Sequence, residues 1–212
     1  MEKQHAQMYQ HEDELVEALV GKDNAAFRIA IKQYQPAMLY LAYSFVGNKI
    51  ADEVVQESWL SAIRALPKFE RRSSLKTWLL RIVANEAKTR LRKENRSLSL
   101  EAMVSESKAL SDRYDDNGQW ADSIPQQWDS DTPDELLSVE ELKQCMNRHI
   151  EALPALQGAT LNLREQQGYS LADICNILEV SESNVRVLLH RARNSLFLCI
   201  EHFQKTGECC TN

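Results

Sequence analysis

The sequence has no hydrophobic run long enough to cross a bilayer. Its longest apolar stretches, such as AMLYLAYSFV, fall well short of the roughly 20 residues that a membrane-spanning helix needs. The first residues, MEKQHAQMYQHEDE, contain no apolar segment of the kind found in signal peptides. We therefore expect a cytoplasmic protein with no direct membrane insertion.

Motifs for catalysis are also missing. Only 6 of the 212 residues are glycine, and we find no glycine-rich phosphate-binding loop, HExxH zinc motif or nucleophile elbow. These absences predict that the chain is not an enzyme and that it uses no cofactor.

Cysteine is scarce and unevenly placed. The five cysteines, an odd number, lie at irregular positions, so we expect reduced thiols rather than a disulfide framework. An alternative is that thiols and imidazoles of the C-terminal half bind zinc or a similar ion, or form a redox switch. The candidates are Cys145, His149, Cys199, His202, Cys209 and Cys210. Their spacing matches no closed zinc motif, and buried thiols plus a frayed tail explain it, so we predict no metal site.

Charge is segregated along the chain. The formal net charge is −6 at pH 7, which argues against a general affinity for nucleic acid, because neutralising phosphates requires a surplus of Lys and Arg. However, residues 71–96 contain nine basic residues against two acidic ones, whereas residues 112–135 contain eight acidic residues against one arginine. This distribution favours local anion-binding surfaces plus one acidic segment that would repel DNA.

The pattern of apolar residues predicts an all-α protein with two helical domains. Helical periodicity runs from about Asp13 to Arg96 and returns near Asp134, which we expect to cap a helix, and no alternating pattern indicates a sheet. Between them, the composition rich in Ser, Asp, Gln and Pro is that of a flexible acidic linker. The predicted divisions are a tail (1–12), an N-terminal helical bundle (13–96), the linker (97–133), a C-terminal helical domain (134–205) and a tail (206–212).

The stretch SLADICNILEVSESNVRVLLHRAR, residues 170–193, predicts a helix-turn-helix. Ser170 and Asp173 form a variant of a capping box, and a second helix is expected to begin after Ser181. On that second helix Val185, Leu189, Ala192 and Leu196 form the apolar stripe. The residues that point away from the stripe are Ser183, Arg186, Val187, His190, Arg191 and Asn194.

Such a second helix can enter a major groove, where Arg can bond guanine and neighbouring cations can hold phosphates. The alternative is a plain corner of two helices with a solvated outer face. Glu179 stands at the corner, where glycine is common, and it would carry a cost if the backbone there is left-handed.

Two further helices carry polar faces. In ADEVVQESWLSAIRAL an acidic and amide-bearing face suits a protein partner better than DNA, while Val55, Trp59, Ile63 and Leu66 are predicted to face inward. In SSLKTWLLRIVANEAKTRLRK, with Ser73 or Ser74 as the cap, four residues form one basic and polar stripe that can follow a phosphate backbone. These are Arg81, Asn85, Lys88 and Arg92.

Together, YSLADICNILEVSESNVRVLLHRARNSL and the segment 50–93 resemble, in order and separation, the two conserved domains of sigma factors of the extracytoplasmic-function (ECF) group within the sigma-70 family. This resemblance implies a surface that docks on the largest subunit of core RNA polymerase, formed by Asp52, Glu53, Gln56 and Glu57. It implies that the basic stripe and the preceding loop read the −10 promoter element as the strands separate, with an unpaired base in a loop pocket. The loop candidates are Phe69, Arg71, Arg72, Ser73 and Ser74.

By the same resemblance the second helix of the helix-turn-helix reads the −35 element. The residues assigned to it are Ser183, Asn184, Arg186, Val187, His190, Arg191 and Asn194. Trp78 could stack on single-stranded bases, but the family pattern favours a place for it in the core. The resemblance also implies an anti-sigma partner, a monomer when free, and weak promoter binding by the isolated protein.

A second interpretation remains open at the level of sequence. A stand-alone helix-turn-helix regulator would use the N-terminal half for sensing or dimerisation, and would bind a palindrome as a dimer without polymerase.

Overall fold

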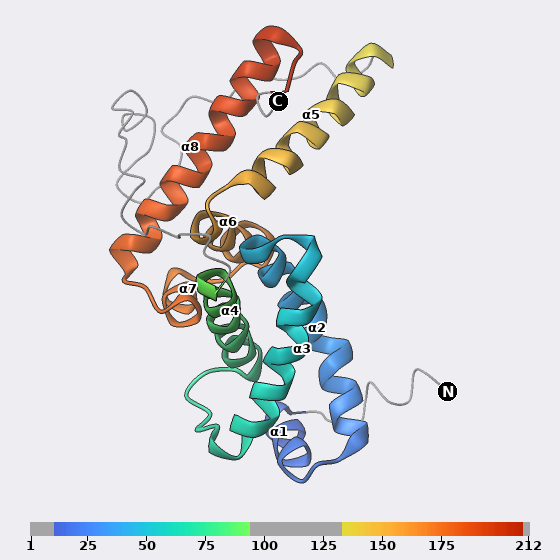
Figure 1. The fold of residues 1–212 in the computed structure, drawn as a ribbon, viewed down its shortest axis with the longest axis vertical. Coiled ribbons are helices and arrows are strands. Elements are labelled where there is room, and N and C mark those ends of the chain that lie inside the picture. Colours follow the sequence, from blue (N-terminus) through green and yellow to red (C-terminus); the bar gives the residue numbers. More distant parts are fainter. Residues whose placement is uncertain (1–10, 94–132, 210–212) are drawn as a thin grey trace. The chain divides into compact units, whose positions relative to one another are not determined.

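The computed structural model of the protein describes residues 11–93 and 133–209. Within these ranges the chain forms helices joined by turns, with no strand, which confirms the all-α fold (Figure 1). The predicted acidic linker, residues 97–133, lies outside the described residues except at its last position. None of the helices in the described ranges is long and apolar enough to cross a membrane.

Residues 11–93 form four α-helices and one short 3₁₀ turn. These are α1 (Glu12–Val20), α2 (Asn24–Val46), α3 (Asn48–Ala65), η2 (Leu66–Lys68) and α4 (Leu75–Lys93). The C-terminal half contains α5 (Pro133–Ala152), α6 (Ala155–Leu161), the π-helical turn η4 (Asn162–Gln166), α7 (Leu171–Leu178) and α8 (Glu182–Thr206). The sequence prediction that Asp134 precedes and caps α5 is wrong, because the helix already begins at Pro133, a residue well suited to a first helical position.

The contacts divide the chain into two compact units. One comprises Met1–Ser97 together with Asn162–Glu182, and the other comprises Leu98–Leu161 together with Ser183–Asn212. This division by contacts places α7 with the N-terminal helices. The domain limits predicted from the sequence, 13–96 and 134–205, follow composition and remain a prediction.

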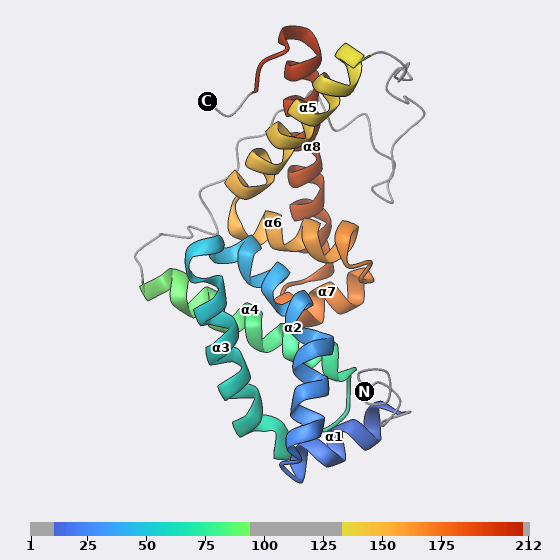
Figure 2. The same cartoon turned by 90° about the vertical axis from the view of Figure 1, so that its right-hand side faces the viewer.

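Helices α2, α3 and α4 form the core of the first unit, with α1 and α7 packed against them (Figures 1 and 2). Asp23 caps α2, since its carboxylate accepts a hydrogen bond from Ala25 N at 2.8 Å. The centre of the unit is apolar. Its largest fully buried side chains include Met38, Leu41, Leu75, Leu79, Leu80 and Val83.

The second unit is formed by α5, α6 and α8. One buried cluster contains Cys145, Cys199 and Phe203, and another contains Leu153, Leu161 and Ala192. Helix α8 ends at Thr206. The next residue, Gly207, has a φ of 70°, a left-handed conformation that glycine adopts without strain and that is common just after a helix. This turn brings the following residues back onto the helix pair α5 and α8.

Candidate nucleic-acid and protein interfaces

The acidic face of α3 is exposed. Helix α3 turns its small and branched apolar residues toward the core of the first unit. All four residues of the predicted protein-binding set, Asp52, Glu53, Gln56 and Glu57, are exposed. Glu53 accepts a hydrogen bond from Arg90 Nη2 of α4 at 2.8 Å, so a cation borders this face. An exposed acidic helix face of this kind suits a basic protein surface.

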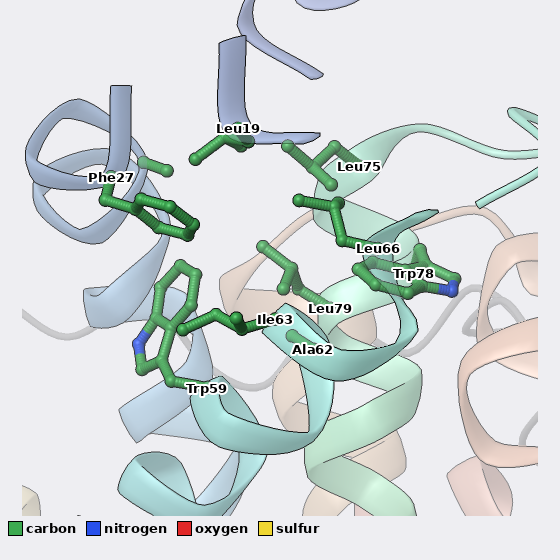
Figure 3. Close-up of a pocket in the computed structure, with 10 residues that line it drawn as sticks. Leu19, Phe27, Trp59, Ala62, Ile63, Leu66, Leu75, Trp78 and Leu79 are labelled. Atoms are coloured by element: carbon green, nitrogen blue, oxygen red, sulfur yellow. The ribbon is translucent and has the colours of Figure 1, made fainter. Parts of the chain in front are cut away.

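The inner side of α3 differs from the sequence prediction at Ile63, which is 42% exposed. The helix is rotated so that Ser58 and Ala62 are buried instead. Ile63 lines a small cavity between α1, α2, α3 and α4 (Figure 3). The cavity measures about 10 Å³, about the space of one water molecule, and is therefore too small for a ligand.

Trp78 of α4 lines the same cavity and is half-buried (Figure 3). Its ring lies 4.9 Å from the ring of Phe69, measured between centroids, at an angle of 39°. The pair connects the loop before α4 to the helix itself, and this supports a packing role for Trp78. Phe69, a predicted member of the loop pocket, is therefore held against α4.

The loop before α4 is anchored by acidic residues of α1. Arg71, in a left-handed conformation with φ of 56°, pairs with Asp13 at 3.1 Å and with Glu17 at 3.3 Å. Leu75 N, at the start of α4, donates to Glu12 Oε1 at 2.8 Å. These contacts with α1 hold the backbone of the loop in place.

The remaining loop candidates have different surroundings. Ser74 is the residue that caps α4, since its hydroxyl accepts a hydrogen bond from Thr77 N at 3.1 Å. Ser73 is half-buried. Arg72 is exposed and pairs with Glu70 at 2.6 Å.

The four residues of the α4 stripe fall into two groups. Arg81, Asn85 and Arg92 are exposed, whereas Lys88 is half-buried. Arg81 and Lys88 contact the C-terminal end of α7: Arg81 Nε donates to Glu179 Oε1 at 2.8 Å, and Lys88 Nζ donates to the carbonyl oxygen of residue 178 at 2.6 Å. Burial lowers the pKa of Lys88, while the charge of Glu179 acts in the opposite direction.

The helix-turn-helix corner forms as predicted. Ser170 caps α7 by accepting from Asp173 N at 3.1 Å, and its hydroxyl donates to the carboxylate of the same residue at 2.6 Å. Helix α7 ends at Leu178 and α8 begins at Glu182, which leaves a three-residue corner. Glu179 is left-handed, with φ of 53° and ψ of 47°, so the cost expected for a residue other than glycine is present.

The outward residues of α8 differ in exposure. Ser183, Arg186 and Val187 are exposed. Four further candidates are half-buried: Asn184, His190, Arg191 and Asn194. Asn194 Nδ2 lies 3.3 Å from a ring nitrogen of His190, and the amide oxygen of Asn194 is buried without a hydrogen-bond partner. The exposed donors therefore gather in the first turns of α8, the part of a recognition helix that contacts base edges.

The cysteines depart from the expectation of reduced thiols. Cys145 and Cys209 form a disulfide, with Cα atoms 5.3 Å apart, and Cys199 Sγ lies 3.4 Å from Cys145 Sγ. The sequence could not indicate this pairing, because only the packing of α5 on α8 and the turn at Gly207 bring residues 145 and 209 within bonding distance.

The remaining metal candidates do not gather. Within residues 11–93 and 133–209 no three His, Cys, Asp or Glu side chains are arranged to hold a metal ion. His149 Nε2 instead contacts Ser195 Oγ at 2.7 Å. His202 is exposed on α8, and Cys210 lies outside the described residues.

Several residues that shape these surfaces were missed by sequence reasoning. Glu12, Asp13 and Glu17 hold the loop before α4, and Lys76 Nζ lies 5.1 Å from the centre of the Tyr169 ring. Glu179 was noted only as an unusual corner residue. Each of these contacts joins positions far apart in the chain, so no local pattern could have found them.

Family models match both halves of the chain. Residues 30–97 match the model of sigma-70 region 2, and residues 143–196 match the model of sigma-70 region 4. Among curated relatives, the ECF RNA polymerase sigma-E factors of Salmonella typhimurium strain LT2 and Escherichia coli strain K12 are each 31% identical over 185 residues, which cover 86% of this chain and 90% of theirs. The corresponding protein of Haemophilus influenzae is 30% identical over 182 residues.

Solved structures share the fold. A structure of CnrH in complex with the cytosolic domain of CnrY is similar with a TM-score of 0.56 and 17% identity, covering 90% of this chain and 97% of that one. The sigma factor RpoE in complex with the anti-sigma factor NepR from Bartonella quintana is similar with a TM-score of 0.53 and 23% identity, covering 86% and 98%.

Proposed function

Because the chain belongs to the ECF group of the sigma-70 family of sigma factors, we propose that it works by binding core RNA polymerase and promoter DNA through the surfaces described above. As an alternative sigma factor it directs transcription initiation. The chemistry of RNA synthesis belongs to the polymerase, and the chain itself acts as a non-enzymatic specificity subunit in the cytoplasm.

The exposed acidic face of α3 is the proposed polymerase-docking surface. Its residues are Asp52, Glu53, Gln56 and Glu57. An acidic and amide-bearing face cannot hold DNA phosphates, which it would repel, but it fits a basic protein surface. Arg90 pairs with Glu53 and so partly neutralises the negative charge of this face.

The −10 element is assigned to α4 and the loop before it. The residues are Phe69, Arg71, Arg72, Ser73, Ser74, Arg81, Asn85, Lys88 and Arg92. Cations spaced along one helix face can follow a phosphate backbone, while Asn85 can reach a base edge. The anchoring of the loop by α1 would present it to an unpaired base in a fixed shape.

The −35 element is assigned to α8. The residues are Ser183, Asn184, Arg186, Val187, His190, Arg191 and Asn194. Arg186 is the strongest of these candidates for base recognition, because it is exposed near the start of the helix and Arg can bond guanine bidentately.

We further propose an anti-sigma protein as a partner, and a monomeric state when no partner is bound. Support for this partner comes from the two similar structures, in which RpoE is bound by an anti-sigma factor and CnrH by the cytosolic domain of CnrY. The alternative of a stand-alone regulator needed a sensor or dimerisation domain in the N-terminal half, and residues 30–97 instead match sigma-70 region 2.

The observation that carries this proposal is the presence of both sigma-70 regions, in order, in one chain. The test is transcription in vitro by bacterial core RNA polymerase on a promoter library, with and without the protein. We expect the protein to co-purify with core enzyme as a single copy and to select a subset of promoters. Binding to a palindromic site as a dimer, with no affinity for core enzyme, would contradict it.

A further inference from the structure

Three sulfur atoms meet in the second unit, where α5 packs against α8. Cys145 of α5 and Cys199 of α8 belong to one buried cluster, and the partly buried Cys209 packs against it. Cys145 is bonded to Cys209, but the Sγ atom of Cys199 lies only 3.4 Å from the Sγ atom of Cys145. Cys145 is therefore within reach of two sulfur atoms and bonded to one of them.

The packing of the two helices holds Cys145 and Cys199 opposite each other. His149 lies one helical turn after Cys145, and it contacts Ser195, which lies one turn before Cys199, at 2.7 Å. The two helices thus run antiparallel here, with the cysteine pair and the His149–Ser195 pair as successive layers between them. Cys209, in contrast, reaches Cys145 from the segment that follows α8.

This arrangement allows the disulfide to change partners without any oxidant. A thiolate attacks one sulfur of a disulfide and displaces the other sulfur as a thiolate. The thiol of Cys199 gives its proton to water, and its Sγ atom then attacks the Sγ atom of Cys145. The Cys145–Cys199 bond forms and the Cys145–Cys209 bond breaks. The electron pair of the broken bond leaves on Cys209 Sγ, which takes up a proton, so one disulfide and one thiol are present before and after.

The two alternative bonds stabilise the fold similarly but differ in the thiol that they leave. They close segments of 64 and 54 residues, and the entropy of closing a loop depends only on the logarithm of its length. However, Cys145 is 0% exposed and Cys199 is 1% exposed, whereas Cys209 is only half-buried. Exchange therefore moves the thiol of this cluster from the interior to a more accessible position, where thiols react faster.

We propose that Cys145, Cys199 and Cys209 form a thiol–disulfide exchange site. Cys199 is the attacking group, Cys145 is the sulfur that changes partners, and Cys209 is released from α5 as a thiol that reacts with small disulfides and other dissolved electrophiles. The exchange involves only α5, α8 and the segment after α8, so it does not depend on the proposed function.

The test uses the full-length protein with Cys175→Ser and Cys210→Ser, which leaves these three cysteines as the only ones in the sequence. The folded protein, purified without reductant, is treated at about pH 8 with N-ethylmaleimide, which alkylates thiols irreversibly and so traps each one as it becomes accessible. Trypsin then places the three cysteines in separate peptides, residues 144–148, 194–205 and 206–212. Mass spectrometry identifies the labelled peptide and the linked pair.

We expect one maleimide per molecule, on peptide 206–212, and a disulfide between peptides 144–148 and 194–205. The labelling rate should stop rising at high maleimide concentration, because the internal exchange then limits it. Cys199→Ser in the same protein is the matched control. It removes the attacking thiol, so it should take up no label and should keep peptides 144–148 and 206–212 linked. Cys199→Ala is a second control in case the serine variant does not fold, which circular dichroism reports.

Label on peptide 194–205, or no label at all, would overturn the inference. Label on peptide 206–212 without a link between the other two peptides would overturn it as well, because Cys209 would then have been a thiol from the start. A new disulfide found only in covalent dimers would show exchange between molecules, and equal labelling of the control variants would show that Cys199 is not the attacking group. Either result would contradict the proposed site.

Discussion

Arg186 is an exposed cation near the start of α8, and its guanidinium can bond a guanine edge bidentately. We predict that Arg186→Ala lowers the affinity of the polymerase complex for its promoter by about 1–3 kcal/mol and relaxes selectivity at one base pair of the −35 element. The measurement is promoter binding by the complex on a library of mutated sites.

Lys205→Ala removes one positive charge from the exposed end of the same helix and serves as the control. It should leave base selectivity unchanged. An equal loss of promoter affinity in both variants would show that only net charge matters.

His149 is half-buried between α5 and α8, where its Nε2 contacts Ser195 Oγ. Burial lowers its pKa below the ordinary value of 6.5, and the hydrogen bond with Ser195 offsets this only in part. The unfolded chain therefore binds a proton near pH 6.5 that the folded chain does not. The contribution of His149 to stability is complete above that pH and is lost as the pH falls toward the folded pKa.

We predict that the free energy of unfolding decreases between about pH 7 and pH 5 and that His149→Gln makes this decrease smaller. Denaturant unfolding at several pH values measures it. His202→Gln removes an exposed histidine from α8 and serves as the control. A wild-type slope in the His149→Gln protein would contradict the prediction.

Helix α7 has eight residues, too few to be stable as an isolated helix in water. Its stability must come from its cap and from the side chains that it buries, Ile174, Ile177 and Leu178. Helix α4 differs, because 19 residues, with Arg90, Arg92 and Lys93 in the last turn, favour the helix locally as well.

We predict that Ser170→Ala destabilises the first unit by about 1 kcal/mol, because the N–H of Asp173 loses its hydrogen-bond acceptor. Ser170→Asp keeps an acceptor at this position and should retain most of the stability. Denaturant unfolding monitored by circular dichroism compares the two. If Ser170→Ala unfolds at the wild-type midpoint, the cap contributes nothing and packing alone holds α7.

At the scale of the whole molecule, the disulfide between Cys145 and Cys209 closes a segment of 64 residues. Closing a long loop removes entropy from the unfolded chain. We predict that Cys209→Ser lowers the free energy of unfolding by about 2–4 kcal/mol under non-reducing conditions, and that reductant lowers the wild-type value to that of the variant.

Cys175→Ser is the control, because Cys175 is a free cysteine on α7. It should behave like the wild-type protein with and without reductant. If reductant leaves the free energy of unfolding of the wild-type protein unchanged, the prediction is wrong.

The sequence by itself determined much of this protein. The capping serine of α7, the three-residue corner, the apolar stripe of α8 and the basic stripe of α4 are all local patterns of one helical period. Local patterns can be read because the residues that decide them lie within a few positions of one another. The family was recognisable for the same reason, since its motifs are continuous segments of the chain.

Only the tertiary structure decided which surfaces meet. The pair of Arg81 and Glu179 joins positions 98 residues apart, and the disulfide joins positions 64 apart. At Ile63 the packing of α3 chose Ser58 and Ala62 as the inner face, although the apolar pattern had favoured Ile63. Contacts of this kind depend on the angle and rotation at which helices pack, and many such arrangements satisfy the same periodic pattern of apolar residues.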